Sequence, residues 1–227
     1  ALIAVLQTDG PPADKAIPCK QLAIYGTKAA VPALAPLLAH EKLASWARIA
    51  LEAIPDPAAT DALREAAGKL QGKLLIGVVN SIAVKRDAKA VELLVGKLKD
   101  ADAEVTSAAA EALGRIGGEA PAKALEQFLP AAPEAARSSV AYGLNLCAER
   151  FLAEGKAGLA VKLYDAVRKS DAPRQRLLEA TRGAILARGP AGVPLMLEQL
   201  KSVDKGVLAI GLRVARERRV PGPGHRR

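Results

Sequence analysis

The feature of this sequence that most constrains its fold is a ladder of apolar residue pairs. In each pair the two residues lie twelve positions apart, on either side of a short segment rich in Gly, Pro and Asp. The first residues of consecutive pairs are separated by 29, 31 and 31 positions, and a further step of 31 reaches Leu144. The pairs are Leu22 with Leu34, Leu51 with Leu63, Ile82 with Leu94, Leu113 with Leu125, and Ile185 with Leu197. This period is typical of a repeat protein, whose units stack to bury one continuous core.

Each repeat has the pattern of two helices joined by a short loop. Between the loops the apolar spacing is helical, and the loops combine helix stops with Asp or Thr N-cap candidates and first-turn Pro. The loops are residues 25–28, 55–57, 85–87, 117–121 and 188–192. We therefore predict an all-α fold, a right-handed α-solenoid of about six helical hairpins.

One repeat is longer than the others and the last is incomplete. Ile185 follows Leu144 by 41 positions, and a Leu152, Gly155, Ala160, Tyr164 pattern lies in the extra stretch. This pattern resembles a tetratricopeptide-type helix pair, so we predict a variant hairpin near residues 148–180. The final repeat begins at about Lys205 and stops after Ala215, which leaves one helix without a partner and self-association of this end open.

Composition and charge agree with this architecture. Hydrophobic residues make up 50% of the 227 residues and aromatic residues only 3%, which excludes collagen-like and simply disordered chains. No apolar run approaches the roughly 18 residues of a membrane span. The net charge is +9, and residues 213–227 contain six arginines against one glutamate. We predict a solenoid over residues 1–216 and a disordered basic tail over residues 217–227. The chain opens within the apolar pattern, which suggests a mature product or a module of a longer protein.

The sequence contains no recognisable catalytic constellation. Cys19 and Cys147 lie in apolar helical patterns without a metal-ligand spacing, so we predict buried free thiols. His40 lies in a turn between helices, where a solvated or capping role is expected. The carboxylate pairs Asp100/Asp102 and Glu52/Asp56 are at loops and exposed faces, where solvation or helix capping is the default. We therefore predict no catalytic residue, metal ligand or cofactor, and a protein that is not an enzyme.

Candidate binding residues follow from the register of the ladder. The positions two and six before each ladder residue form one stripe, which we expect to line the concave face, and a nearby stripe adds two arginines. The stripe is mixed and weakly polar, and it includes Lys20 and Ile49. The candidate binding residues are Ser45, Arg48, Asn80, Ser107, Glu111, Ser138, Tyr142 and Arg182. Such a face suits a polypeptide, whereas nucleic acid requires a basic track with stacking aromatics. We expect Trp46 to pack against the next unit.

Two segments resemble a known repeat family. Residues 112–118, Ala-Leu-Gly-Arg-Ile-Gly-Gly, and residues 30–38, Ala-Val-Pro-Ala-Leu-Ala-Pro-Leu-Leu, look like HEAT repeats of the short bacterial, bilin-lyase type. The resemblance covers roughly residues 14–215. This stretch of residues is also similar to HEAT regions of large modular secreted bacterial proteins. That similarity implies a binding or scaffolding role in a periplasmic or secreted setting, with the cytoplasm as an open alternative, and carries over no catalytic residues.

The function we predict is a protein-interaction scaffold or an accessory module. Its partner would be another protein or the neighbouring modules of a longer polypeptide. Two alternatives remain open. One is a ligand-handling protein of bilin-lyase-like or chaperone-like activity, and the other is a DNA-binding protein that recognises lesions.

Overall fold

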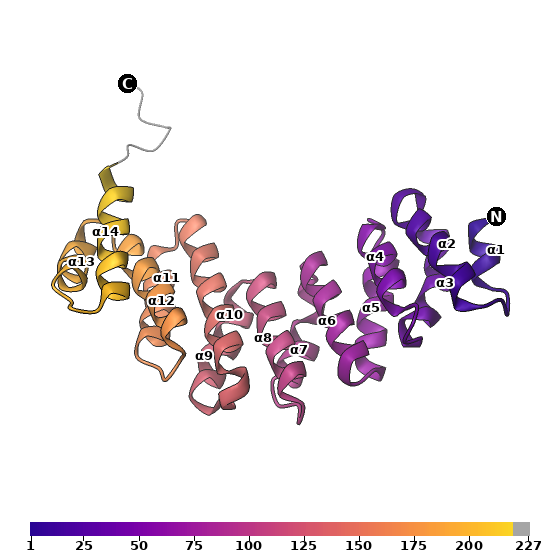
Figure 1. The fold of residues 1–227 in the computed structure, drawn as a ribbon, viewed down its shortest axis with the longest axis horizontal. Helices are drawn as coiled ribbons and strands as arrows, with labels where there is room; N and C mark the ends of the chain where they lie inside the picture. Colours follow the sequence, from indigo (N-terminus) through magenta and orange to yellow (C-terminus); the bar gives the residue numbers. More distant parts are fainter. Residues whose placement is uncertain (220–227) are drawn as a thin grey trace, which may run out of the picture. The chain divides into compact units, whose positions relative to one another are not determined.

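A computed structural model describes residues 1–219 of the chain, all in helices and the turns between them. These residues form fourteen α-helices and five short 3-10 helices, with no β-strand among them (Figure 1). The all-α prediction is therefore confirmed. The chain divides into two compact units, Ala1–Ile116 and Gly117–Arg227, which we describe separately.

The first unit contains eight α-helices in two layers. The even-numbered helices pack consecutively, α2 on α4, α4 on α6 and α6 on α8, while α5 and α7 lie against this layer (Figure 1). The helices are α1 (Leu2–Leu6), α2 (Pro12–Tyr25), α3 (Val31–Leu34), α4 (Ala44–Ala53), α5 (Pro57–Lys69), α6 (Gly72–Lys85), α7 (Val91–Lys97) and α8 (Ala103–Ile116). The 3-10 helices are η1 (Lys28–Ala30), η2 (Ala35–Ala39) and η3 (Ala88–Ala90).

Loop residues set several of these helix ends. The Asp56 carboxylate accepts a hydrogen bond from the Ala58 N–H at 2.9 Å, and Pro57 follows as the first residue of α5. Asp87 caps η3 in the same way, accepting from the Lys89 N–H at 3.1 Å. Side-chain acceptors satisfy the free N–H groups of a first turn, so these aspartates have the capping role that the sequence predicts.

The second unit contains six α-helices among its described residues. Its even-numbered helices also pack consecutively, α10 on α12 and α12 on α14, and α11 packs against both α10 and α12. The helices are α9 (Glu119–Phe128), α10 (Glu134–Ala153), α11 (Ala157–Arg168), α12 (Arg174–Ala187), α13 (Val193–Leu200) and α14 (Lys205–Arg219). The 3-10 helices are η4 (Leu129–Ala131) and η5 (Gly189–Gly192). The long repeat begins with α10, which has 20 residues where α6 and α8 have 14.

The apolar ladder forms the core of both units, with one exception. Leu144 and the first members of the five pairs, from Leu22 to Ile185, are at most 5% exposed, and Leu34, Leu63, Leu94 and Leu125 are completely buried. Leu197, the predicted partner of Ile185, is instead 48% exposed. It lies on α13, and the described chain has no further odd-numbered helix to cover it. The repeat register is thus confirmed, while burial at Leu197 was wrongly predicted.

The variant hairpin owes its close packing to a glycine. Ala160 and Tyr164 are buried on α11, as the tetratricopeptide-like pattern suggests, and Gly155 makes the turn before α11 with φ +77°. On α12, a Cβ added to Gly183 would lie 2.3 Å from ring atoms of Tyr164. Only a residue without a side chain therefore allows α11 and α12 to approach this closely.

The last described helix passes the predicted end of the solenoid. We placed that boundary at residue 216, whereas α14 ends at Arg219 and the Glu217 side chain bonds to Arg182. Residues 220–227 lie outside the described part, so the disorder of the tail stays a prediction, as does a single solenoid over residues 1–216. Within residues 1–219, no helix is both long and apolar enough to span a bilayer.

Candidate interaction surface

The predicted binding residues all lie on even-numbered helices and are accessible to solvent. Ser45 and Asn80 are exposed, and the other six are partly exposed. Their helices are α4 for Ser45 and Arg48, α6 for Asn80, α8 for Ser107 and Glu111, α10 for Ser138 and Tyr142, and α12 for Arg182. Accessibility alone does not make them available to a partner, because several bond within their own unit.

Arg48 connects two helices of the first unit. Its Nη1 donates to the Gly77 carbonyl oxygen at 2.8 Å and to Ser81 Oγ at 3.2 Å, so α4 is tied to α6. A Cβ at Gly77 would lie 2.8 Å from Arg48 Nε, which shows how closely the guanidinium crosses the backbone of α6. Arg48 thus has a structural role in addition to any contact with a partner.

In the second unit Arg176 covers two of the predicted residues. Its guanidinium lies 4.5 Å from the Tyr142 ring centroid, and its Nε donates to Ser138 Oγ at 3.3 Å. Its Nη1 also bonds both carboxylate oxygens of Glu179, at 2.8 and 3.0 Å. A partner that reaches Tyr142 or Ser138 therefore meets an arginine that sequence reasoning missed.

Arg182 is bound to the C-terminal helix of the second unit. Its Nη2 donates to the two carboxylate oxygens of Glu217 at 2.9 and 3.0 Å. The sequence separation of 35 residues gives no local signal for this pair. Arg182 therefore links α12 to α14.

The first unit also exposes a group of apolar side chains, of which only Ile49 belongs to the stripe predicted from the sequence. Ile17 and Ile24 lie on α2, Trp46 and Ile49 on α4, and Val84 on α6, with exposed fractions between 36% and 71%. We call these five residues the apolar face. They occupy the positions five before, two before or two after a ladder residue, so they share one register on helices that pack side by side. Trp46, which we expect to pack against the next unit, keeps 36% of its surface exposed.

Polar side chains border the apolar face. Lys20 is exposed between Ile17 and Ile24 on α2, and Lys73 is exposed near the start of α6. Ser45 and Asn80, two of the predicted binding residues, lie beside Ile49 and Val84 in register. The surface therefore combines four aliphatic side chains and the Trp46 indole with a hydroxyl, an amide and cationic groups.

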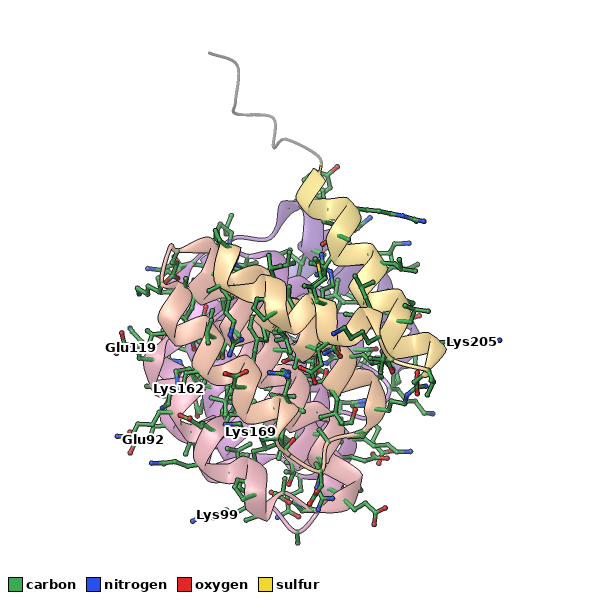
Figure 2. The ribbon with its side chains drawn as sticks, turned by 90° about the vertical axis from the view of Figure 1, so that its left-hand side faces the viewer. Glu92, Lys99, Glu119, Lys162, Lys169 and Lys205 are labelled. Carbon is green, nitrogen blue, oxygen red and sulfur yellow. The ribbon has the colours of Figure 1, made fainter. Side chains whose placement is uncertain are left out.

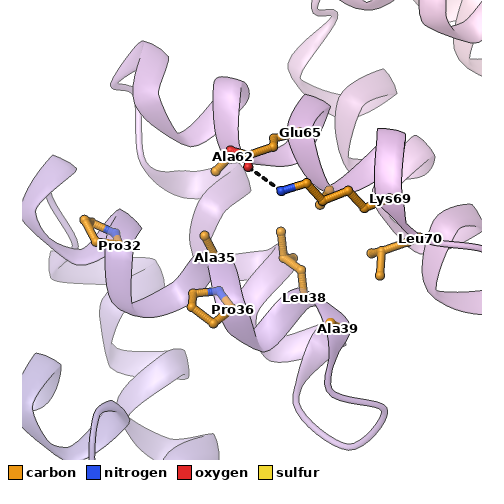
Figure 3. Close-up of a pocket in the computed structure, with 10 residues that line it drawn as sticks. Pro32, Ala35, Pro36, Leu38, Ala39, Ala62, Glu65, Lys69 and Leu70 are labelled. Atoms are coloured by element: carbon orange, nitrogen blue, oxygen red, sulfur yellow. Dashed lines mark hydrogen bonds and ion pairs between the residues drawn. The ribbon is translucent and has the colours of Figure 1, made fainter.

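A hollow of 360 Å³ lies between α3, η2 and α5 of the first unit (Figure 3). Pro32 of α3, Pro36 of η2 and small alanines line it, and the facing α5 contributes Ala62 and Ala66. At its rim Lys69 Nζ bonds Glu65 at 2.6 Å, and this hydrogen bond lowers the pKa of the Glu65 carboxyl. The hollow is lined mainly by apolar side chains, and the Glu65–Lys69 ion pair is its polar feature.

The residues with potential catalytic chemistry have other environments. Cys19 and Cys147 are free and buried, as predicted, and burial raises the pKa of the Cys147 thiol to about 12. His40 is exposed, and its Nδ1 accepts a hydrogen bond from the Lys42 N–H at 3.2 Å. Among residues 1–219, no group of three His, Cys, Asp or Glu side chains is placed to hold a metal ion.

Comparison with known proteins supports the repeat assignment. The family model for HEAT repeats matches residues 71–145, which confirms the resemblance to HEAT repeats for the middle of the chain. No curated protein sequence matches the chain significantly. The similarity to modular secreted proteins stays a prediction.

Two solved structures with a TM-score above 0.5 show the same fold at low sequence identity. An engineered protein is 20% identical with a TM-score of 0.53, over 94% of this chain and 66% of its own. A chain from the structure of Kap95p bound to RanGDP is 12% identical with a TM-score of 0.56, over 94% of this chain and 32% of its own. The complex of CpcE and CpcF of phycocyanin lyase from Nostoc is 17% identical with a TM-score of 0.43, over 95% of this chain and 80% of the other. At these identities the likeness concerns the fold alone.

Proposed function

We propose that this protein is a non-catalytic interaction module that binds a polypeptide partner on the apolar face. The observation that carries the proposal is the common register of five exposed large apolar side chains on three packed helices. Covering each such side chain contributes about 1.5–3 kcal/mol for complete burial, so a partner that shields several of them gains affinity. Exposed large apolar side chains in a common register on neighbouring helices are a pattern typical of interaction sites.

The chemistry of the face favours an amphipathic helix with acidic flanks. Such a helix supplies apolar anchors at spacings of three, four and seven residues, which matches the spacing of Ile17 and Ile24 on α2. Lys20 and Lys73 are placed to meet acidic side chains of the partner. Trp46 is the one aromatic side chain among the five residues of the face, so the face offers little stacking surface for successive bases and suits a polypeptide better than nucleic acid.

The environment of the reactive side chains supports a non-catalytic role. The Cys147 thiol is buried and its raised pKa keeps it protonated, whereas a nucleophilic cysteine requires a lowered pKa. Asp56 and Asp87 bond to backbone N–H groups as helix caps. Binding through a helical surface therefore accounts for the observed arrangement better than chemistry does.

The proposal is tested with a fluorescent amphipathic peptide carrying Leu at heptad-type spacing and Glu on its flanks. Fluorescence anisotropy should show saturable binding by the intact protein. Ile49→Asp should weaken it by about tenfold or more, because a charge is then buried at the centre of the contact. Val203→Asp is the matched control, since Val203 is fully exposed and lies outside the apolar face.

The scrambled peptide and a single-stranded oligonucleotide complete the experiment. Both should bind at least about tenfold more weakly than the amphipathic peptide, as expected for apolar recognition. Equal losses in Ile49→Asp and Val203→Asp, or preference for the oligonucleotide by protein lacking residues 220–227, would contradict the proposal. Thermal unfolding of each variant shows that the fold is retained.

A further inference from the structure

A second surface, of different chemistry, lies in the second unit between α10, α12 and α14. It is a groove of 460 Å³, which we call the arginine groove. Its cations are Arg174 and Arg182 of α12 and Arg213 of α14, and its apolar floor includes Leu178 and Ile210. Glu149 of α10 lines one side. The C-terminal helix that supplies Arg213 begins at Lys205, which is labelled in Figure 2.

Two of these arginines share a single carboxylate. Arg182 holds Glu217 through its Nη2, and Arg213 Nε donates to the same carboxylate at 3.2 Å. Arg213 is 67% exposed, and its two terminal nitrogens have no acceptor among the described residues. Because two guanidinium groups share one carboxylate, Arg213 keeps charged N–H donors that a ligand can use.

The hydrogen-bond donors of Arg174 are also only partly used. One of its terminal nitrogens bonds Asp204, and within residues 1–219 its other N–H groups have no acceptor. Arg174 and Arg213 thus present free donors from α12 and α14, with Leu178 and Ile210 also lining the groove. A ligand that fits both features carries anionic groups beside an aliphatic group.

The carboxylates of the groove discriminate between possible anions. Glu179, which also lines the groove, is neutralised by Arg176 at 2.8 Å. Burial raises the pKa of the Glu149 carboxyl, against the opposing effect of Arg182. A continuous phosphate backbone has to run past these two acidic residues, whereas separate side-chain carboxylates can be spaced to avoid them.

We propose that the arginine groove binds an acidic polypeptide segment. Carboxylates of the segment bond the free N–H groups of Arg213 and Arg174, and an aliphatic side chain between them covers Leu178 and Ile210. The inference shares with the proposed function only the class of partner. It uses residues of the second unit alone, so each proposal can fail without the other.

The test compares two arginines on the same helix. The probe is a fluorescein-labelled peptide of repeating Glu-Leu-Glu units, and its binding to the full chain is measured by anisotropy at low and moderate salt. Arg213→Gln should weaken binding about tenfold, as expected for loss of charge-assisted hydrogen bonds. Arg216→Gln is the matched control, because Arg216 is exposed on α14 with the same charge and does not line the groove.

Further arms identify the ligand class. Arg174→Gln should also weaken binding of the Glu-Leu-Glu peptide, whereas Ile49→Asp on the first unit should leave that binding unchanged. A peptide with Gln in place of every Glu should bind at least about tenfold more weakly, since it lacks the charges. The proposal is overturned if Arg213→Gln and Arg216→Gln lose affinity equally, if the Gln peptide binds as well, or if single-stranded DNA binds more tightly than the acidic peptide. Circular dichroism of each variant checks that α14 remains folded.

Discussion

Gly183 decides how closely α11 and α12 pack in the second unit. A Cβ at this position meets the Tyr164 ring at 2.3 Å, and both residues are buried. We expect Gly183→Ala to lower the free energy of unfolding by about 1–3 kcal/mol, because the ring has to move within a filled core. Urea denaturation measures the change.

Gly158 provides the control for this substitution. It lies on α11, and a Cβ there has no heavy atom within 4 Å. Gly158→Ala should be neutral or stabilising by up to about 1 kcal/mol, since alanine favours the helix. If both variants lose stability equally, the close approach of Tyr164 to Gly183 is wrong.

The sequence predicted single residues well where one helix decides their environment. The buried ladder leucines and the buried thiols follow from helical spacing alone. The partners of Arg48 and Arg182 do not, because Gly77 and Glu217 are 29 and 35 residues away. Which donor reaches which acceptor depends on how far each helix is rotated against its neighbour.

At the scale of the element, Lys85 joins two helices of the first unit. Its Nζ donates to the Ile54 carbonyl oxygen at 2.6 Å and to the Glu52 carbonyl oxygen at 3.3 Å, at the C-terminal end of α4. We expect Lys85→Met to lower the free energy of unfolding by about 1–2 kcal/mol, because the terminal carbonyls lose a charged donor. Chemical denaturation provides the measurement.

Lys73→Met is the matched control on the same helix. Lys73 is exposed and makes no hydrogen bond or ion pair among the described residues, so its replacement should change stability by less than about 0.5 kcal/mol. Equal effects of the two substitutions would show that Lys85 does not stabilise the end of α4.

Helix boundaries were predictable where a capping residue marks them and less so elsewhere. Asp56 and Asp87 mark their helix starts in the sequence as in the structure. The end of α14 lies three residues beyond the predicted boundary of the solenoid, since Arg182 holds Glu217 in the helix. We did not predict the change from α3 to the 3-10 helix η2, which contains Pro36, a residue without the N–H that an α-helical bond to the Pro32 carbonyl needs.

At the scale of the molecule, each unit has its own extended core. A core substitution should therefore destabilise mainly the helices of its own unit. Leu113 of α8 is completely buried, so Leu113→Ala should lower stability by about 2–5 kcal/mol through the cavity it leaves. In repeat proteins each helix pair interacts mainly with its neighbours. We expect hydrogen exchange to show lost protection in α6 and α8 and little change in α12.

Ile185→Ala serves as the reciprocal variant in the second unit. Ile185 is also completely buried, and its loss should reduce protection in α10 and α12 more than in α6. If either substitution lowers protection evenly over both units, the cores are coupled more strongly than nearest-neighbour packing allows.

The sequence by itself determined the repeat period, the helical class and the leucines of the core. These follow from local spacing, because an apolar stripe at helical period must be buried and a repeated stripe must be buried in the same way each time. Only the tertiary structure decided which polar groups are already bonded and which apolar groups remain exposed. The apolar face, the Arg182–Glu217 pair and the contact between Gly183 and Tyr164 depend on the rotation and spacing of neighbouring helices, which the sum of many side-chain contacts sets.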